Sequence, residues 1–568
     1  MATKLVIVGG VAGGASAAAR ARRISEDAQI VLFERGDYVS FANCGLPYHI
    51  AGVIPRRERL LVQTPEGLHR RFRIDVRTGA EVLRLDPEAK TVRVRELATG
   101  REFDESYDKL ILSPGAEPVK PPLPGIQRGG IYTLRTMADM DRILAAINKL
   151  QPEHAVVVGG GYIGLEMTEA LRDRGMRVTL LEMANQVMNP LDPEMAAPLH
   201  EHLERKGVRL GLGIAVAGFG ETRGKLEVRC RGGEPVAADL VILAIGVKPE
   251  VKLAREAGLK IGELGGITVD ERLRTSDPNI YAVGDAIEVT DPVTDRPALI
   301  PLAGPANRQG RIAADNALGR DGRYRGTQGT SICKVFELAA GSTGANEKTL
   351  RRLGRPYRKV YLHPADHATY YPKAYPVSLK VLFRPEDGKL LGAQAVGVHG
   401  VDKRLDVFST ALHAGLTVYD LEELELCYAP PYGSAKDPVN YAGFIAANAL
   451  RGDVELAYAE DVLSLKPGQA VLDVRTRAEL EGGRIPGAVN IPVDELRDRL
   501  SELAQDKEWL VTCRVGQRGY IACRILRQHG FRCRNLTGGF LTYQSVTGQA
   551  QLVRGRPREA REDTGETS

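Results

Sequence analysis

A single cysteine, Cys44, stands in the stretch Ser-Phe-Ala-Asn-Cys-Gly-Leu-Pro-Tyr that spans residues 40–48. Glycine-rich segments that predict nucleotide binding lie before and after it, and no other cysteine is near it in the sequence. Disulfide chemistry needs two sulfur atoms, so this thiol must take its partner from a bound small thiol. Cys44 therefore predicts redox chemistry with one protein thiol. The alternative is a buried, unreactive cysteine, a common state of a free cysteine.

The first glycine-rich segment opens the chain. Residues 5–8 are a short apolar run typical of a buried parallel strand, and Gly-Gly-Val-Ala-Gly-Gly at 9–14 leads into a helix expected over 15–23. Glycines let the backbone approach a pyrophosphate, which the N–H groups at a helix start stabilise. Val11 replaces the usual middle glycine, so the fingerprint is imperfect. Glu34 ends the next strand, where a carboxylate binds ribose hydroxyls. The residues expected to hold this nucleotide are Gly9, Ala12, Gly13, Gly14, Glu34 and Arg35.

The second segment, Gly-Gly-Gly-Tyr-Ile-Gly at 159–164, is a complete dinucleotide fingerprint directly after the apolar run 155–158. The next expected strand, 178–181, ends at Glu182. A carboxylate there accepts hydrogen bonds from a ribose 2′-hydroxyl and repels a 2′-phosphate, so we expect NADH to be preferred over NADPH. The residues expected at this site are Gly159, Gly161, Tyr162, Ile163, Gly164 and Glu182.

Residues 275–286, Thr-Ser-Asp-Pro-Asn-Ile-Tyr-Ala-Val-Gly-Asp-Ala, resemble a motif of flavin disulfide reductases whose aspartate binds the ribityl chain of FAD. The resemblance gives that role to Asp285. Together with both fingerprints and the 40–48 string, this motif makes residues 1–450 similar to the coenzyme A disulfide reductase family. Its single-cysteine branch also includes NADH oxidase and NADH peroxidase. The resemblance implies a mixed disulfide between Cys44 and coenzyme A, cleared by electrons that pass from NADH through FAD.

The same resemblance implies a substrate site and a homodimer. Residues 427–438 are similar to the family's dimerisation motif, which reaches the partner subunit's active site. Tyr370 and Tyr428 are candidate proton donors to the leaving thiolate or persulfide, and the alternative for each is an aromatic residue with a satisfied hydroxyl group. By matched position, coenzyme A would be held by Ser16, Arg20, Arg23, Ser40, Asn43 and Lys436. For the arginines, the alternative is a solvated helix end.

After residue 453 the pattern of strands restarts, and the segment resembles a rhodanese. Cys513 ends an apolar run, and the backbone N–H groups of the loop that follows would surround a thiolate or persulfide. Arg514 and Arg518 add positive charge that favours the thiolate. The resemblance implies that Cys513 carries sulfane sulfur.

Three further features of this segment bear on the rhodanese interpretation. Asn-Leu-Thr-Gly-Gly-Phe at 535–540 completes the family's closing motif. Arg484 stands where many rhodaneses have histidine, which affects no catalytic step. Cys523 and Cys533 are expected to be buried residues of a helix and a strand.

Composition and length bound the remaining possibilities. The 77 basic and 72 acidic residues nearly balance and are spread through all 568 residues, so we expect no nucleic-acid partner. We expect no membrane span, no leader peptide and no metal site with cysteine ligands, and hence a cytoplasmic location. The expected fold is α/β, with two nested Rossmann-like domains, an α+β dimerisation domain and an α/β rhodanese domain. The expected boundaries are 1–118 with 246–325 for FAD, 119–245 for NAD(P)H, 326–450 for dimerisation, 458–552 for the rhodanese and 553–568 for a disordered tail.

Taken together, these motifs predict an FAD-dependent enzyme that uses NADH to reduce coenzyme A persulfide or polysulfide and coenzyme A disulfide. Cys513 would carry the sulfane sulfur, and hydrosulfide would be the product. One alternative is a simple coenzyme A disulfide reductase for thiol homeostasis. Another is an NADH oxidase or peroxidase that uses a sulfenic acid at Cys44. A non-enzymatic sulfur-relay or redox-sensing adaptor would require negligible flavin turnover, which two intact fingerprints argue against.

Overall fold

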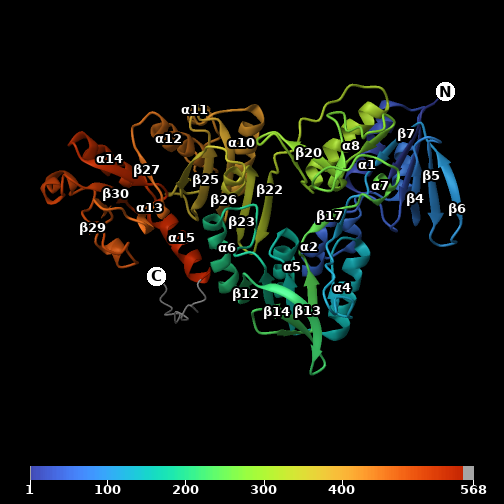
Figure 1. The fold of residues 1–568 in the computed structure, drawn as a ribbon, viewed down its shortest axis with the longest axis horizontal. Coiled ribbons are helices and arrows are strands. Elements are labelled where there is room, and N and C mark those ends of the chain that lie inside the picture. Colours follow the sequence, from blue (N-terminus) through green and yellow to red (C-terminus); the bar gives the residue numbers. More distant parts are fainter. Residues whose placement is uncertain (1, 554–568) are drawn as a thin grey trace. The chain divides into compact units, whose positions relative to one another are not determined.

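A computed structural model describes residues 2–553 of the chain (Figure 1). The tail expected over 553–568 lies, apart from its first residue, outside the described residues. The chain divides into two units, residues 1–181 with 215–329 and residues 182–214 with 330 onward.

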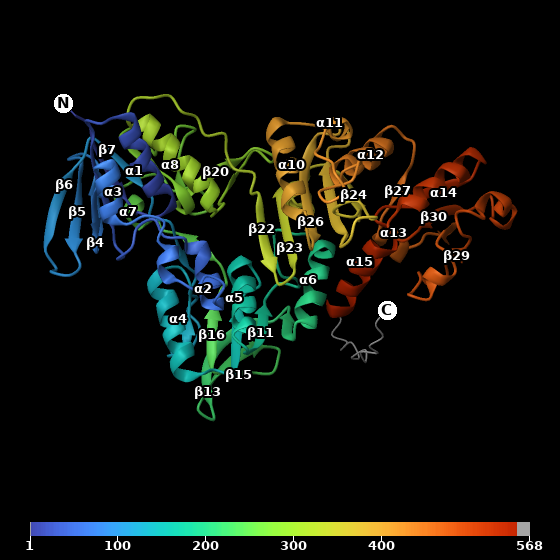
Figure 2. The ribbon, with the colours of Figure 1, turned by 180° about the vertical axis from the view of Figure 1, so that it is seen from behind.

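The first unit is organised around a parallel five-stranded sheet. Its three central strands are apolar and buried in their interiors, as expected for a parallel sheet that is covered on both faces. Helices α1 (Ala12–Ile24) and α8 (Ala303–Ala317) lie side by side (Figures 1 and 2). In spatial order the strands are β19 (Ile280–Ala282), β7 (Lys109–Leu112), β1 (Lys4–Val8), β2 (Gln29–Glu34) and β3 (Asp75–Thr78). Because β19 follows the second fingerprint in the sequence, the strands of this sheet come from two separate stretches of the chain.

The second fingerprint lies on another parallel sheet of the same unit. Its strands here are β11 (Arg177–Glu182), β10 (His154–Val158), β16 (Leu240–Leu243) and β9 (Ile131–Tyr132), with helices α4 (Met137–Leu150) and α5 (Tyr162–Asp173). Smaller antiparallel groups complete the unit: β4 (Ala80–Asp86) with β5 (Thr91–Glu96) and β6 (Glu102–Ser106), β8 (Ala116–Pro118) with β17 (Val247–Pro249), β13 (Ala215–Thr222) with β14 (Lys225–Arg231) and β15 (Val236–Ala238), and β20 (Ile287–Asp291) with β21 (Arg296–Ala298). The remaining elements are α2 (Leu46–Ala51), α3 (Pro65–Phe72), α7 (Lys252–Glu256) and β18 (Ile267–Thr268).

The second unit contains an antiparallel sheet and a parallel sheet. The antiparallel sheet has the order β22 (Ser331–Val335), β23 (Leu338–Gly344), β26 (Leu390–Gly397), β25 (Val377–Phe383) and β24 (Arg358–Leu362), so β24 is an edge strand. Its sequence also forms α6 (Pro193–Arg205), β12 (Val208–Leu212), α9 (Glu347–Arg352), α10 (Val401–Ala414), α11 (Val418–Glu423) and α12 (Pro438–Leu450).

The parallel sheet belongs to the rhodanese-like segment. Its order is β27 (Leu456–Ala457), β31 (Arg532–Leu536), β30 (Glu508–Thr512), β28 (Gln469–Asp473) and β29 (Val489–Asn490), with helices α13 (Ala459–Leu463), α14 (Gln517–Gln528) and α15 (Gly539–Val553). β27 pairs with β31, so the sheet begins two residues before the expected boundary at 458. α14 begins at Gln517, four residues after Cys513.

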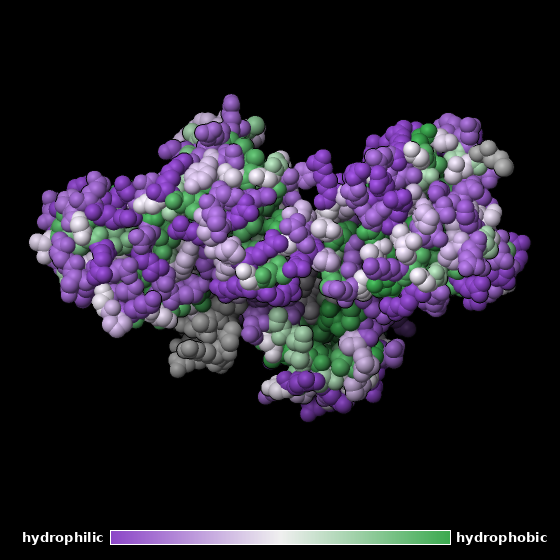
Figure 3. All heavy atoms as spheres, turned by 45° about the horizontal axis from the view of Figure 1, so that its top comes forward, coloured by the Kyte–Doolittle hydropathy of each residue, from purple (hydrophilic) through white to green (hydrophobic). Residues whose placement is uncertain are grey.

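The surface and the helices give no sign of a membrane segment in the part of the chain that the structure describes. Hydrophilic residues cover much of the face shown in Figure 3. Within residues 2–553, no helix combines the length and the apolar character that a bilayer crossing requires.

Candidate active site

The first glycine turn is shaped to receive a phosphate group. Gly9 has a φ of +95°, and a Cβ at this position would clash with the carbonyl oxygen of Ser113, so only glycine fits. α1 begins at Ala12 directly after the turn, where the helix dipole is positive. The carboxylate of Glu34 accepts a hydrogen bond from Gly10 N at 2.8 Å, which fixes it at the end of β2. These residues fit the adenosine and pyrophosphate end of FAD.

The second glycine turn repeats this arrangement. Gly159 has a φ of +107°, and a side chain there would clash with the carbonyl of Ala244. A Cβ at Gly161 would meet nothing within 4 Å, so the space beside the start of α5 is open. At the end of β11, the carboxylate of Glu182 accepts a hydrogen bond from Ala184 N at 2.7 Å. The turn fits a second dinucleotide.

The loop that carries Cys44 is tied to the first glycine turn. Ser40 adopts a left-handed conformation with a φ of +47°, and its N–H donates to the carbonyl of Gly10 at 2.8 Å. Cys44 lies in a short 3-10 helix, Asn43–Gly45, and its N–H donates to Asn43 Oδ1 at 3.1 Å. The thiol is exposed in this chain. The loop therefore presents one accessible thiol next to the site expected for the flavin.

Negative groups surround this thiol. Although the residue is exposed, the surrounding loop partly removes its sulfur from water; this desolvation raises the pKa of Cys44, and the carboxylates of Glu166 and Asp285 raise it further. Burial also raises the pKa of Asp285, against the opposing effect of Arg135. The structure thus brings Asp285 close to Cys44, as expected if both serve one flavin. The helix after Cys44, α2, has only six residues, so its dipole gives the thiolate little support.

Glu166 is a site residue that the sequence reasoning missed. Its carboxylate accepts a hydrogen bond from Tyr48 Oη at 3.3 Å, across 118 residues of sequence. Burial raises the pKa of Glu166 to about 7, although the Tyr48 hydroxyl acts in the opposite direction. Tyr48 ends the Cys44 string, and Glu166 lies two residues after the second fingerprint. Their contact joins the two motifs beside one thiol.

The residues expected to hold coenzyme A are only partly available. Arg20 forms an ion pair with Asp315 on α8 at 2.8 Å, so its guanidinium already has a carboxylate partner. Arg23 is exposed and lies 6.0 Å above the ring of Phe72. The other expected positions are the hydroxyl of Ser16, which contacts Asn307, and the exposed residues Asn43 and Lys436.

The two tyrosines proposed as proton donors meet in the structure. The hydroxyls of Tyr370 and Tyr428 lie 2.7 Å apart, and both side chains are exposed. Arg404 fixes the two loops that carry them, because its buried guanidinium donates to the carbonyl of Asp366 at 2.7 Å and to Asp437 Oδ2 at 2.8 Å.

Cys513 has a different environment from Cys44. Its sulfur is buried, and the N–H of Gly516 donates to it at 3.1 Å. Arg518 holds Glu479 in two hydrogen bonds of 2.7 and 2.6 Å. This pairing raises the pKa of Arg518, and Cys513 raises it further. The same pairing lowers the pKa of Glu479 to about 2. Arg514 is exposed. The loop therefore offers a fixed positive charge and an N–H group to one sulfur.

Supporting residues of this loop were partly missed. Glu479 was not predicted, because it lies in a short 3-10 turn without buried residues, and no sequence motif marks such a position. A buried ion pair between Arg475 and Asp473, at 2.7 Å, lies at the end of β28. Cys523 and Cys533 are buried in α14 and β31, which confirms their expected placement.

Comparison with known families agrees with this geometry. The profile of the family described as "Pyridine nucleotide-disulphide oxidoreductase" matches residues 3–310, and its dimerisation domain matches 330–437. A profile described as "Rhodanese-like domain" matches residues 458–545. Coenzyme A disulfide reductase of Staphylococcus aureus is 36% identical over 444 residues, which cover 78% of this chain and 99% of that protein.

Solved structures resemble the whole chain. Reduced CoADR-RHD of Bacillus anthracis is 51% identical with a TM-score of 0.95, covering 97% of this chain and 99% of its own. A NAD-dependent persulfide reductase from A. fulgidus is 38% identical with a TM-score of 0.89, covering 95% and 100%. The water-forming NADH oxidase of Lactobacillus brevis, bound to NADH, is 27% identical with a TM-score of 0.76 and covers 80% of this chain and 100% of its own.

Proposed function

Because the chain belongs to the pyridine nucleotide-disulphide oxidoreductase family and ends in a rhodanese-like domain, we propose that it uses NADH to reduce coenzyme A persulfide and coenzyme A disulfide. The observation that carries the proposal is the pairing, in one chain, of an exposed thiol in a loop tied to the first glycine turn with a second thiol in a positively charged loop. The first thiol suits disulfide reduction, and the second suits transport of sulfane sulfur.

In the proposed cycle Cys44 is the nucleophile. Its thiolate attacks the coenzyme A sulfur of the persulfide, the sulfur–sulfur bond of the persulfide breaks, and hydrosulfide leaves. A mixed disulfide between Cys44 and coenzyme A remains. FAD, when bound by the Gly9 turn, Glu34 and Asp285, supplies the two electrons from NADH that return Cys44 and coenzyme A to thiols. With one proton taken up, NADH and the persulfide give NAD⁺, coenzyme A and hydrogen sulfide.

The chain's own residues control the protons of this cycle. Glu166 titrates near neutral pH and lies beside Cys44, so it is suited to hold the proton that the thiol releases. The hydroxyl pair of Tyr370 and Tyr428 is suited to protonate the leaving hydrosulfide, acting from the partner subunit of a homodimer. The dimerisation profile supports that assembly.

Cys513 has the proposed role of accepting sulfane sulfur and passing it to coenzyme A. The N–H of Gly516 and the guanidinium of Arg518 would stabilise the terminal sulfur of a Cys513 persulfide. Glu182 supports a preference for NADH, because its carboxylate would repel the 2′-phosphate of NADPH.

The test is anaerobic NADH oxidation with coenzyme A persulfide, coenzyme A disulfide and peroxide as competing acceptors. We expect the persulfide to react fastest, hydrosulfide to appear in equal amount to NAD⁺, and Cys44→Ser to abolish turnover. Faster reaction of coenzyme A disulfide would support simple thiol homeostasis instead. Similarity to an NADH oxidase makes peroxide turnover without added thiol the main alternative, and that outcome would refute the proposed cycle.

A further inference from the structure

Residues 535–541, here called the closing segment, donate hydrogen bonds to the loop of Cys513. The N–H of Phe540 donates to the carbonyl of Cys513 at 2.8 Å, and the N–H of Leu541 donates to the carbonyl of Arg514 at 3.1 Å. The side-chain amide of Asn535 donates to the carbonyl of Gly516 at 3.1 Å. Three carbonyls of the loop therefore depend on the position of the closing segment.

The opposite side of the closing segment is attached to the edge strand β24. The hydroxyl of Thr537 accepts a hydrogen bond from Tyr361 N at 2.9 Å and donates to Tyr361 O at 3.2 Å. One turn later, the Thr542 hydroxyl lies 2.9 Å from Nε2 of His363. His363 is the residue directly after β24, and Thr542 bonds its ring rather than the backbone of the strand. The Thr537 hydroxyl therefore satisfies both backbone groups of Tyr361 on the outer edge of β24.

Two consecutive glycines make this attachment close on both sides. A Cβ at Gly538 would lie 2.6 Å from Tyr361 Cβ, and a Cβ at Gly539 would lie 2.8 Å from the carbonyl oxygen of Arg514 and clash with that of Cys513. Both glycines have positive φ, +72° and +60°. At these two glycines, the backbone of the closing segment therefore packs directly against β24 on one side and against the Cys513 loop on the other, with no side chain between them.

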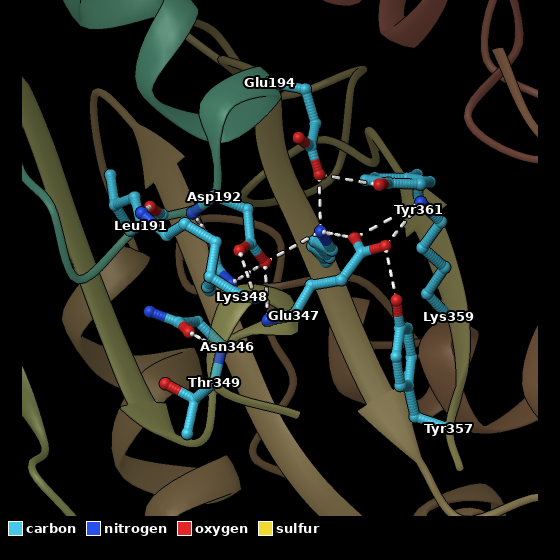
Figure 4. Close-up of polar contacts among 12 residues, drawn as sticks. Leu191, Asp192, Glu194, Asn346, Glu347, Lys348, Thr349, Tyr357, Lys359 and Tyr361 are labelled. Carbon is cyan, nitrogen blue, oxygen red and sulfur yellow. Dashed lines mark hydrogen bonds and ion pairs between the residues drawn. The ribbon is translucent and has the colours of Figure 1, made fainter. Parts of the chain in front are cut away.

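Tyr361 is in turn held by a buried group of charges (Figure 4). Its hydroxyl donates to Glu194 at 2.6 Å, and Lys380, which is 0% exposed, lies 2.7 Å from Asp192 and 2.6 Å from Glu347 as well as against Glu194. Burial alone would lower the pKa of Lys380, but the three carboxylates raise it, so the lysine stays charged at neutral pH.

A buried charge group of this kind is weak evidence for stability. Replacing buried ion pairs with well-packed apolar residues is often neutral or stabilising, whereas directional bonds fix one geometry. Glu347 extends the group to Lys359 at 3.1 Å, and Lys359 reaches Glu460 of the rhodanese-like segment at 3.0 Å. The group therefore fixes Tyr361 and the rhodanese-like segment to the same set of atoms.

We propose that Tyr361 and Thr537 are positioning residues for Cys513, and that β24 sets the conformation of the sulfur-carrying loop through the closing segment. The inference rests on the proposed sulfur-transfer role of Cys513. The loop of Cys513 is then not set by its own domain alone. Its three braced carbonyls orient the N–H of Gly516 toward the sulfur, so a shift of the closing segment moves the group that stabilises a persulfide.

The experiment uses the full chain with FAD and two measurements. The first is sulfur transfer from thiosulfate to cyanide, and the second is the pH dependence of Cys513 alkylation by iodoacetamide, in a Cys44→Ser background with the modified peptide located by mass spectrometry. For Thr537→Val we expect transfer to fall roughly tenfold and the alkylation profile to shift, because misplacement of reacting groups is costly. Thr537→Ser should restore both, and coenzyme A disulfide reduction in the chain that keeps Cys44 should not change.

Two further variants keep the test decisive. Thr542→Val removes a hydroxyl from the same attachment without removing the Thr537 bonds, so it should leave the alkylation profile unchanged. Tyr361→Phe removes the hydrogen bond to Glu194 and should shift the alkylation profile in the same direction as Thr537→Val, but less. If Thr537→Val does not fold, the Tyr361→Phe variant provides the test. An unchanged profile in Thr537→Val or Tyr361→Phe, or an equal shift in Thr542→Val, overturns the proposal. Alkylation needs no sulfur donor, so a chain that fails to transfer sulfur at all would refute the proposed function and leave the positioning role to be judged separately.

Discussion

The two thiol sites of this protein are built in opposite ways. Cys44 is exposed, lies in a short loop and has two carboxylates near it, which disfavour its thiolate. Cys513 is buried, accepts a backbone N–H and lies beside an arginine held by Glu479. The first site depends on a bound cofactor and substrate to favour the thiolate, whereas the second obtains its stabilisation from the chain itself. Chemistry at Cys44 should therefore respond to ligands, and chemistry at Cys513 to packing.

The strongest test of this contrast is whether the sites work independently. Cys44→Ser should lower coenzyme A disulfide reduction by at least about 10³-fold, since it removes the nucleophile, and should leave sulfur transfer from thiosulfate to cyanide intact. Cys513→Ser should show the reverse pattern. Steady-state rates of both reactions on both variants provide the measurement. Loss of both activities in either variant would show that the sites share a step.

Acid should loosen the Cys513 region selectively through His363. This imidazole lies 2.9 Å from both Ser378 and Thr542 hydroxyls, and burial lowers its pKa from 6.5 to about 4. Below pH 6.5 the imidazole binds a proton in the unfolded chain but stays neutral in the folded chain. The free energy of unfolding therefore keeps its full value above pH 6.5 and decreases as the pH falls toward 4, by at most ~3 kcal/mol.

Urea unfolding followed by tryptophan fluorescence measures this loss, because Trp509 is the single tryptophan of the sequence and is buried in β30. His363→Gln keeps a group that can bond both hydroxyls and removes the titration. Equal acid sensitivity in the variant and the parent would contradict the assignment.

The positive charge at Cys513 gives a prediction of intermediate size. Arg518→Gln should lower sulfur transfer by roughly 10²-fold, the lower end of the loss that follows removal of one preorganised donor to a developing charge. Arg514→Gln is the matched control, because Arg514 is exposed, and should change the rate much less. If both variants behave alike, general charge rather than the fixed Arg518 would favour the persulfide.

The smallest effect is expected at Cys44. Glu166→Gln removes a charge that raises the pKa of Cys44, so alkylation of this thiol should become a few-fold faster. Because the pKa of Glu166 is about 7, the difference should appear above pH 7 and vanish below about pH 6, where the parent carboxyl is already neutral. Rates of iodoacetamide reaction in a Cys513→Ser background, from pH 5.5 to 9, measure it. A constant ratio across this range would exclude the carboxylate as the cause.

Local patterns in the sequence predicted the strands and glycine turns well. The apolar runs at 5–8 and 155–158 became β1 and β10, extended by one residue each, because such runs are stable only as buried parallel strands. Short motifs in the sequence singled out Cys44, Asp285 and Cys513 as candidate site residues.

Contacts between distant residues could not be read in the same way. Glu166 with Tyr48, and Thr537 with Tyr361, join residues 118 and 176 positions apart. Lys380 lies in the largely apolar strand β25, and nothing in that strand shows that three carboxylates from other segments will neutralise it. Pairing of this kind is decided by how layers pack, which short-range periodicity does not encode.

The attachment of β24 to the closing segment has a consequence for synthesis of the chain. The ribosome completes β24 and then adds 176 residues before Thr537 follows Tyr361, which at ~5 to 20 residues per second takes roughly 10 to 35 s. During that interval the nascent chain carries an uncovered sheet edge, the kind of surface on which misassembly starts. A message that stops after α12 would leave this edge open permanently, so residues 451–553 also act as a cover, made late in synthesis, for the part of the chain made before them.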